Sequence, residues 1–438
     1  MSMESIRVEQ LESGLRAAFV NLPHFRTHSA RLTIGAGSVH ETPDAYGAAH
    51  FLEHVTFQGT EAMPDEQDVH RYAEEKGLAK NAFTNQMYTT YIADGYELES
   101  VGFFVSQLGL RPALATEALE GERKPIVDEI RGYASSPYFD VGIAHDRATR
   151  GELYSRPIGG TIEDVQRMTP EALRSFHQRH YRLGNAVLVL CSPEPVDRQR
   201  EFAETLMAGY SEDGEDQPAF VELGDFNPNN LTASLQRVDL PPTAQSSVII
   251  SYGIPETTSP REQLSYNLVS MVLSKVAHNR LRRELALCYG ASAGITRLSD
   301  SNFGRDKSWS HFTATAKLNG EDAVTGLETL RTDVLHSPFP ETVFDSILVA
   351  LHRDVDHVMQ SNPSQIADRV RDILTFSRRN EVALDEVEDF AKTITLDTLR
   401  KLHKGLTDTK PLVLATSPDQ SVLDSVGEWA SSITNRRR

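Results

Sequence analysis

The sequence of 438 residues has only two cysteines, Cys191 and Cys288, and no apolar run of the length that a membrane-spanning helix requires. Two isolated cysteines exclude a disulfide scaffold and a cysteine-based metal or redox motif. The first ten residues carry acidic side chains and lack the apolar stretch of a secretory signal. We therefore expect a cytoplasmic protein with no membrane partner.

Basic residues are also scarce, because 62 aspartates and glutamates face 44 lysines and arginines, which gives a formal net charge of -18. Nucleic-acid binding depends on basic patches, so we expect no nucleic-acid partner. The acidic excess has two interpretations, which are solubility and an acidic surface that attracts basic peptides.

The chain is too long for one ordinary hydrophobic core, and it repeats itself once. The segment Thr169–His177 resembles Thr395–His403, and both are followed by an apolar strand that ends in Ser-Pro and an acidic residue. The two motifs recur with nearly the same offset, which predicts the duplication of one domain. Two unrelated helix starts with Thr-x-x-acid caps are the alternative.

An acidic, proline-bearing stretch predicts a linker at 208–230, between a first domain at 1–207 and a homologous second domain at 231–438. Strand and helix patterns mix in both halves. The sequence therefore predicts an α+β fold, with a mostly antiparallel sheet in each domain and helices on one face of it. The expected strands are 6–9, 15–20 and 30–37, and the expected helices are 101–114, 161–181, 262–287 and 362–376.

The candidate chemistry begins with His50, Glu53 and His54 in an otherwise apolar segment. Thr42 as a cap and Pro43 at the first helical position predict a helix that starts there. Histidines four residues apart share a helix face, so both imidazoles can bind one zinc ion, with a position left for water. The alternative is a surface helix with incidental polar residues.

A second helix would place Glu122 and Glu129, seven residues apart, on one face. His50-x-x-Glu53-His54 has the inverted motif of the inverzincins. With Glu129 placed 75 residues after His54, the chain resembles the pitrilysin family of insulinase-like M16 metallopeptidases, in its short-chain branch that includes the processing peptidases.

The resemblance implies one Zn²⁺ per chain, held by His50, His54 and Glu129. It also implies Glu53 as general base and Glu122 as a group that supports the ligands. Asp128 is a weaker alternative to Glu129, and Pro125 can kink the helix between Glu122 and Glu129.

Two further segments match the family. Asn81, Ala82, Phe83 and Thr84, taken together with Thr89 and Tyr91, resemble the strand that pairs with substrate backbone, although an ordinary edge strand has the same pattern. Arg282 and Tyr289 resemble a pair that contacts the substrate near the scissile bond. A solvated helix charge is the alternative for Arg282, and Arg283 is a neighbouring candidate.

The family implies a zinc endopeptidase that hydrolyses unstructured or precursor peptides. It also implies a homodimer, or a heterodimer with a related chain, in which Arg282 and Tyr289 of one subunit complete the zinc site of the other. The alternative function is a non-catalytic or partner subunit of a heterodimeric peptidase of the same family.

Overall fold

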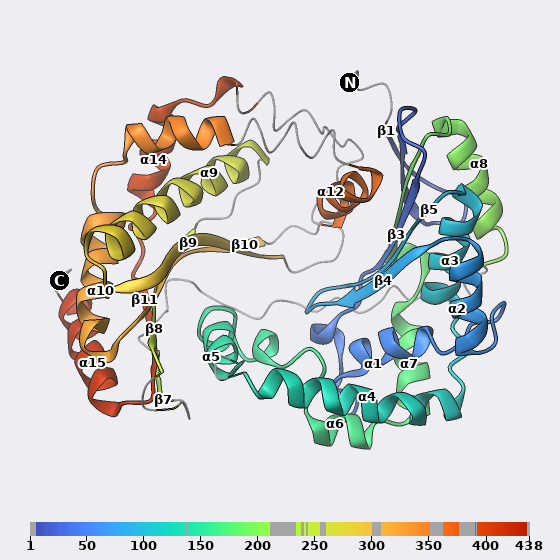
Figure 1. The fold of residues 1–438 in the computed structure, drawn as a ribbon, viewed down its shortest axis with the longest axis horizontal. Coiled ribbons are helices and arrows are strands. Elements are labelled where there is room, and N and C mark those ends of the chain that lie inside the picture. Colours follow the sequence, from blue (N-terminus) through green and yellow to red (C-terminus); the bar gives the residue numbers. More distant parts are fainter. Residues whose placement is uncertain are drawn as a thin grey trace.

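The structure is a computed structural model that describes residues 6–136, 139–210, 234–237, 241, 244–254, 260–299, 308–350, 362–375, 390 and 392–435. Two lobes, each built on one sheet, face each other across the molecule (Figure 1). The predicted α+β fold is confirmed.

The first sheet has six strands in the order β1-β2-β6-β3-β5-β4. Only the β2–β6 pair is parallel, and β4 lies at one end with β5 as its neighbour. The strands are β1 (Ile6–Gln10), β2 (Arg16–Asn21), β3 (His28–Ile34), β4 (Ala79–Thr84), β5 (Thr89–Gly95) and β6 (Ala186–Ser192).

Helices of the first half of the chain cover one face of this sheet, with α3 against β3 and β5 and α8 against β2. The helix α1 packs against α4, α7 and β4, and so joins the sheet to the lower helical layer in Figure 1. The first half of the chain forms the helices α1 (Ala48–Thr56), α2 (Glu66–Glu75), α3 (Leu98–Leu110), α4 (Thr116–Ala134), α5 (Phe139–Arg150), α6 (Ile162–Arg167), α7 (Pro170–His180) and α8 (Val196–Met207).

The other face of the first sheet is covered by α12 (Pro363–Thr375), which comes from the second half of the sequence. Val187 and Val189 of β6 form a core cluster with Ile366 and Val370 of α12. Leu188, which alternates with them, faces the helices of the first half. The sequence predicted helices on one face of each sheet. The first sheet instead has helices on both faces, because α12 covers the second face.

The second sheet has the order β7-β11-β8-β10-β9, and its β7–β11 pair is parallel, as β2–β6 is in the first sheet. Its five strands repeat the order and the directions of the last five strands of the first sheet, so the predicted homology of the two domains is confirmed. The elements are β7 (Ser234–Arg237), β8 (Ser246–Ile254), α9 (Pro260–Ala277), a π-helical turn at His278–Glu284, β9 (Cys288–Ser299), β10 (Ser308–Leu318), α10 (Ala323–Thr329), α14 (Leu396–Gly405), β11 (Leu412–Ser417) and α15 (Gln420–Asn435).

The repeated sequence motifs have the same local role in both halves. Thr169 and Thr395 cap α7 and α14, each by accepting a hydrogen bond from the backbone N–H three residues later. Ser192 and Ser417 are the last residues of β6 and β11. The hydroxyl of each accepts a hydrogen bond from the backbone N–H of the acidic residue two positions later. The matching sequence motifs of the two halves thus form the same hydrogen bonds at the helix start and at the strand end.

Most expected elements are present, with some shifted boundaries. The predicted helix at 161–181 is two helices, α6 and α7, which are separated at Met168 and Thr169. Residues 211–230 of the predicted linker lie outside the described residues, so the domain boundaries stay predictions. None of the helices in the described part of the chain is long and apolar enough to span a membrane.

Candidate metal centre

The helix α1 begins at Ala48, and not at Pro43 as the sequence indicated. Gly47 caps it with a left-handed φ of 88°, which residues with a side chain rarely adopt. The buried Glu41 carboxylate accepts hydrogen bonds from the N–H groups of Gly47 and Ala49 at 2.8 and 2.9 Å. The start predicted at Pro43, with Thr42 as the cap, was wrong: the N-cap is Gly47, and the N–H groups of Gly47 and Ala49 are bound by a carboxylate from outside the helix.

His50, His54 and Glu129 come together between α1 and α4. The Nε2 atom of His54 lies 3.1 Å from Glu129 Oε2, and the Nε2 atom of His50 lies 3.6 Å from the same oxygen. One ligand atom from each of the three residues lies within 4.8 Å of the others. Asp128, the weaker alternative, instead pairs with Arg131 at 2.9 Å on the exposed side of α4.

These three residues fit a zinc ion. Two atoms bound about 2.0–2.1 Å from one tetrahedral zinc lie about 3.3 Å apart, which the observed separations bracket. Neutral imidazole nitrogen and carboxylate oxygen are ordinary zinc donors, and three protein ligands leave one position for water. The arrangement therefore suits a catalytic site better than a closed structural site.

Two neighbours fix the candidate ligands. Glu122 Oε2 lies 3.1 Å from His54 Nδ1, so the second nitrogen of that ring has a carboxylate partner. The hydroxyl of Tyr133 donates to Glu129 Oε1 at 2.7 Å, which leaves Oε2 directed at the histidines. The helix α4 runs unbroken through Pro125, so Glu122 and Glu129 keep a common face.

The pKa values of the two histidines differ because their surroundings differ. Burial, reinforced by the neighbouring His54, lowers the pKa of His50 to about 4. Burial also acts to lower the pKa of His54, but the hydrogen bond with Glu122 and the charge of Glu129 raise it above its usual value. A neutral His50 is the form that can bind a metal.

Glu53 lies on α1 beside the candidate ligands and does not belong to their cluster. Its Oε2 accepts a hydrogen bond from the Thr84 hydroxyl at 2.6 Å. Burial raises the pKa of Glu53, and the Thr84 hydroxyl acts in the opposite direction. Thr84 thus holds the Glu53 carboxylate, which lies close enough to His54 and Glu129 for their charges to act on its pKa.

Thr84 ends β4, and the predicted substrate strand coincides with this element. β4 pairs with β5 along one edge and has no strand on the other edge within the described residues. Thr89 and Tyr91, which the sequence grouped with β4, belong to β5, which lies between β4 and β3 and offers no free edge. Of the residues that the sequence grouped as the substrate strand, only Asn81–Thr84 therefore lie on an edge strand of the described sheet.

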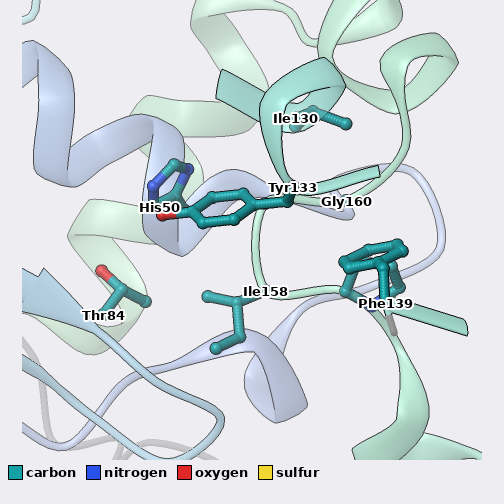
Figure 2. Close-up of a pocket in the computed structure, with 9 residues that line it drawn as sticks. His50, Thr84, Ile130, Tyr133, Phe139, Ile158 and Gly160 are labelled. Carbon is teal, nitrogen blue, oxygen red and sulfur yellow. The ribbon is translucent and has the colours of Figure 1, made fainter. Parts of the chain in front are cut away.

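A cavity of about 260 Å³ opens beside the candidate ligands. Figure 2 shows the ring of Tyr133 extending toward His50, with Ile158 on one side of the cavity and Phe139 at its far end. Its lining residues come from several separate segments and are mostly apolar: His50, Thr84, Ile130, Tyr133, Phe139, Pro157, Ile158, Gly159 and Gly160. A β-carbon at Gly159 would lie 3.3 Å from His50 Nδ1, so glycine lets this wall approach the ring.

Arg282 and Tyr289 contact each other but lie away from this centre. The guanidinium carbon of Arg282 lies 4.3 Å from the centroid of the Tyr289 ring, which favours Arg282 over Arg283 as its partner. Tyr289 is 77% exposed. In Figure 1 the elements that carry the pair, at the end of α9 and the start of β9, belong to the lobe opposite α1 and α4. One chain does not bring the pair to the candidate metal centre.

Sequence reasoning missed Tyr133 and the cavity. Tyr133 follows Glu129 by four residues on α4, and that spacing was a readable signal for a shared helix face. Ile158 and Phe139 carry no such signal, because they approach the centre only through the fold.

The comparisons with known proteins agree with this geometry. Residues 16–161 match the family model described as "Insulinase (Peptidase family M16)", and residues 167–321 match "Peptidase M16 inactive domain". An uncharacterized zinc protease of Mycobacterium leprae is 34% identical over 174 residues, which are 39% of this chain and 39% of that protein.

Two further relatives have named functions. Coenzyme PQQ synthesis protein F of Pseudomonas putida is 31% identical over 47% of this chain and 28% of its own length. Mitochondrial-processing peptidase subunit beta of Caenorhabditis elegans is 31% identical over 49% of this chain and 47% of its own length. The matches thus span less than half of each of these relatives.

Solved structures share the fold over almost the whole chain. A protease from Helicobacter pylori has a TM-score of 0.79 at 18% identity and covers 94% of this chain and all of its own. Pitrilysin has a TM-score of 0.71 at 14% identity, with 99% of this chain matched to 49% of its own. From the two family models, which together cover most of the sequence, we conclude that this chain belongs to the insulinase family of peptidases, peptidase family M16.

Proposed function

We propose that this protein is a zinc-dependent endopeptidase whose metal is held by His50, His54 and Glu129. The observation that supports the proposal best is the convergence of these three residues with Glu53 beside a free strand edge. Family membership supports peptidase chemistry in general, and the donor set supports zinc.

In the proposed reaction, different residues of the chain bind the metal, transfer the proton and hold these groups in position. A zinc ion at this centre would lower the pKa of its bound water and polarise the scissile carbonyl. Glu53 accepts the proton of the attacking water and delivers it to the leaving amine. The Thr84 hydroxyl keeps the Glu53 carboxylate aimed at that water, and Glu122 and Tyr133 keep His54 and Glu129 in place.

The substrate is an extended peptide that adds a strand to the free edge of β4. Backbone pairing along Asn81–Thr84 makes few demands on the substrate sequence. The cavity lined by Ile130, Phe139 and Ile158 adds one demand, because it suits an apolar side chain close to the scissile bond. Peptides with an apolar residue at that position are the preferred class.

The active unit is a dimer in which each site is shared. The pair Arg282 and Tyr289 is exposed and lies in the lobe opposite the metal centre of its own chain, which supports a role at the centre of a second chain. Pitrilysin supports this stoichiometry, because this chain matches half of it. The partner is a second copy, as symmetric pairs are the common case, or a related chain.

The proposal is tested by metal content and cleavage together. Purified protein should carry about one zinc per chain and cleave unstructured peptides, and removal of the metal by a chelator should stop cleavage until zinc is returned. Glu129→Gln should lose both zinc and activity. Asp128→Asn, a matched change of the adjacent exposed carboxylate, should keep both. A wild-type chain that binds zinc and cleaves no peptide, alone or with a related chain, would indicate a non-catalytic subunit.

A further inference from the structure

Helix α12 belongs to the second half of the sequence, yet it carries Arg371 to the strand proposed to pair with substrate. The guanidinium carbon of Arg371 lies 5.1 Å from the centroid of the Phe83 ring in β4. Arg371 is only 8% exposed, so this contact is shielded from water. A cation over an aromatic face is stabilising, and more so when it is removed from solvent.

The guanidinium of Arg371 is held in a fixed orientation by two carboxylates of its own helix. Its Nη1 donates to Asp368 at 3.1 Å, while Nε and Nη2 donate to Asp372 at 3.2 and 2.7 Å. A planar group fixed by several donors loses little further freedom when it stacks on a ring. The two carboxylates therefore hold the Arg371 guanidinium in the orientation in which it contacts the Phe83 ring.

The helix itself is anchored to the sheet by a buried charge. Arg31 of β3 is 1% exposed, and it donates to Asp368 at 2.8 Å and to Asp94 of β5 at 2.9 Å. Its Nη2 also donates to the Ser364 hydroxyl at 2.6 Å. A buried guanidinium is costly to leave unpaired, so breaking these bonds is unfavourable. They therefore hold α12 in place against the sheet.

Phe83 and Thr84 connect this anchor to the proposed active site. Successive side chains of a strand point to opposite faces, so Phe83 faces α12 while Thr84 faces Glu53 on α1. The ring of Tyr88 stands edge-on to Phe83, at 6.0 Å between centroids, in the turn that joins β4 to β5. The edge strand is thus held from both faces.

We propose that Arg371 is a positioning residue for substrate binding, which holds β4 through its contact with Phe83 so that the free edge is ready to pair with a peptide. The second half of the chain thereby prepares the substrate edge of its own first half. A strand that is already ordered spares the peptide the entropic cost of ordering it, so the contact acts on substrate affinity. The inference rests on the proposed peptidase function.

Steady-state kinetics test the role. Arg371→Met should raise KM by about fivefold, the equivalent of a cation–π contact of ordinary strength, with kcat and zinc content close to wild type. Arg371→Lys keeps a positive charge that can lie over the ring but loses the planar group that Asp368 and Asp372 orient, so its KM should lie between those of wild type and Arg371→Met. Arg369→Met, on the exposed side of the same helix, is the matched control and should leave KM unchanged. An unchanged KM in Arg371→Met would overturn the proposal.

A double-mutant cycle tests the contact itself. In a Phe83→Leu background the change Arg371→Met should alter KM by less than about twofold, because the partner ring is already absent. If Arg371→Met keeps its full effect without Phe83, the contact does not carry the effect and the proposal is wrong.

Hydrogen exchange separates this inference from the peptidase function, because it needs no turnover. Amides of residues 79–95 should exchange faster in Arg371→Met than in wild type, and those of Arg369→Met should not. Equal exchange in all three proteins would contradict the proposed role of Arg371. A zinc-loaded wild type that cleaves no peptide would contradict the peptidase function and leave the exchange result to decide on Arg371.

Discussion

The hydroxyl of Thr84 donates a hydrogen bond of 2.6 Å to Glu53, which links the free edge strand to the proposed general base. Thr84→Val removes this donor but keeps the shape of the side chain. Because a hydrogen bond to a charged group contributes about 1.5–3 kcal/mol, kcat/KM should fall by about tenfold or more, with zinc content unchanged. Thr84→Ser, which retains a hydroxyl, should stay close to wild type. Equal kinetics in the valine and serine variants would show that the bond does not orient Glu53.

The hydrogen bond from Tyr133 is the second contact that the structure adds to the candidate metal centre. Tyr133→Phe removes its hydrogen bond to Glu129 and nothing else of the side chain. Loss of such a supporting bond weakens metal affinity by about 10-fold to 100-fold, and we expect the lower end because Tyr133 is 58% exposed. Competition with a chelating dye measures the zinc dissociation constant. Tyr96→Phe, at another exposed tyrosine, is the control, and an equal affinity in both variants would count against a role for Tyr133.

The proposed sharing of the site between two chains predicts complementation between two inactive variants. Glu53→Gln lacks the base and Tyr289→Phe lacks the phenol hydroxyl of the contacting pair, so each homodimer should be nearly inactive. If the site is shared, a mixed dimer has one site with native Glu53 from one subunit and native Tyr289 from the other, and mixing should therefore restore activity. Subunit exchange is verified by mass. If the exchanged mixture stays inactive, the site is not shared between chains.

Buried histidines predict acid sensitivity of the first domain. Burial lowers the pKa of His180 to about 3, and neither ring nitrogen has a hydrogen-bond partner among the described residues. In the unfolded chain His180 binds a proton below its ordinary pKa of about 6.5, whereas in the folded chain it does not until the pH nears about 3. The free energy of unfolding therefore falls as the pH drops from about 6.5 toward about 3.

The measurement for this prediction is urea unfolding at pH 7 and pH 5. His180→Phe removes the titrating group, and the loss of unfolding free energy between the two pH values should be smaller than in wild type by about 2 kcal/mol. His24→Gln, at an exposed histidine, should match wild type in this pH dependence. The same loss in His180→Phe and in wild type would assign the acid sensitivity to other groups.

Local patterns in the sequence were enough to predict the helix with His50 and His54, the shared face of Glu122 and Glu129, and the duplication. Each of these predictions depends on helical spacing or on a short capping motif that recurs in the chain. Both features can be recognised within a short stretch of sequence. The start of α1 was not predictable in this way, because Glu41 caps it from outside the helical pattern.

Long-range packing was harder to predict. The seven residues of β6, Ala186–Ser192, are all buried, and a continuous apolar run is the pattern of a strand covered on both faces. That run could have indicated a helix on the second face. It could not have identified α12 as that helix, nor the approach of Arg371 to Phe83, because these follow from the packing of a helix of the second half of the chain on the first sheet.

The most direct test of the account is Glu53→Gln, with zinc and turnover measured on the same sample. The side chain is close in size to glutamate and is not among the candidate ligands, but its amide cannot accept the proton of the attacking water. We predict about one zinc per chain, as in wild type, and loss of nearly all peptide cleavage. A Glu53→Gln protein that still cleaves peptides at the wild-type rate would contradict the proposed mechanism.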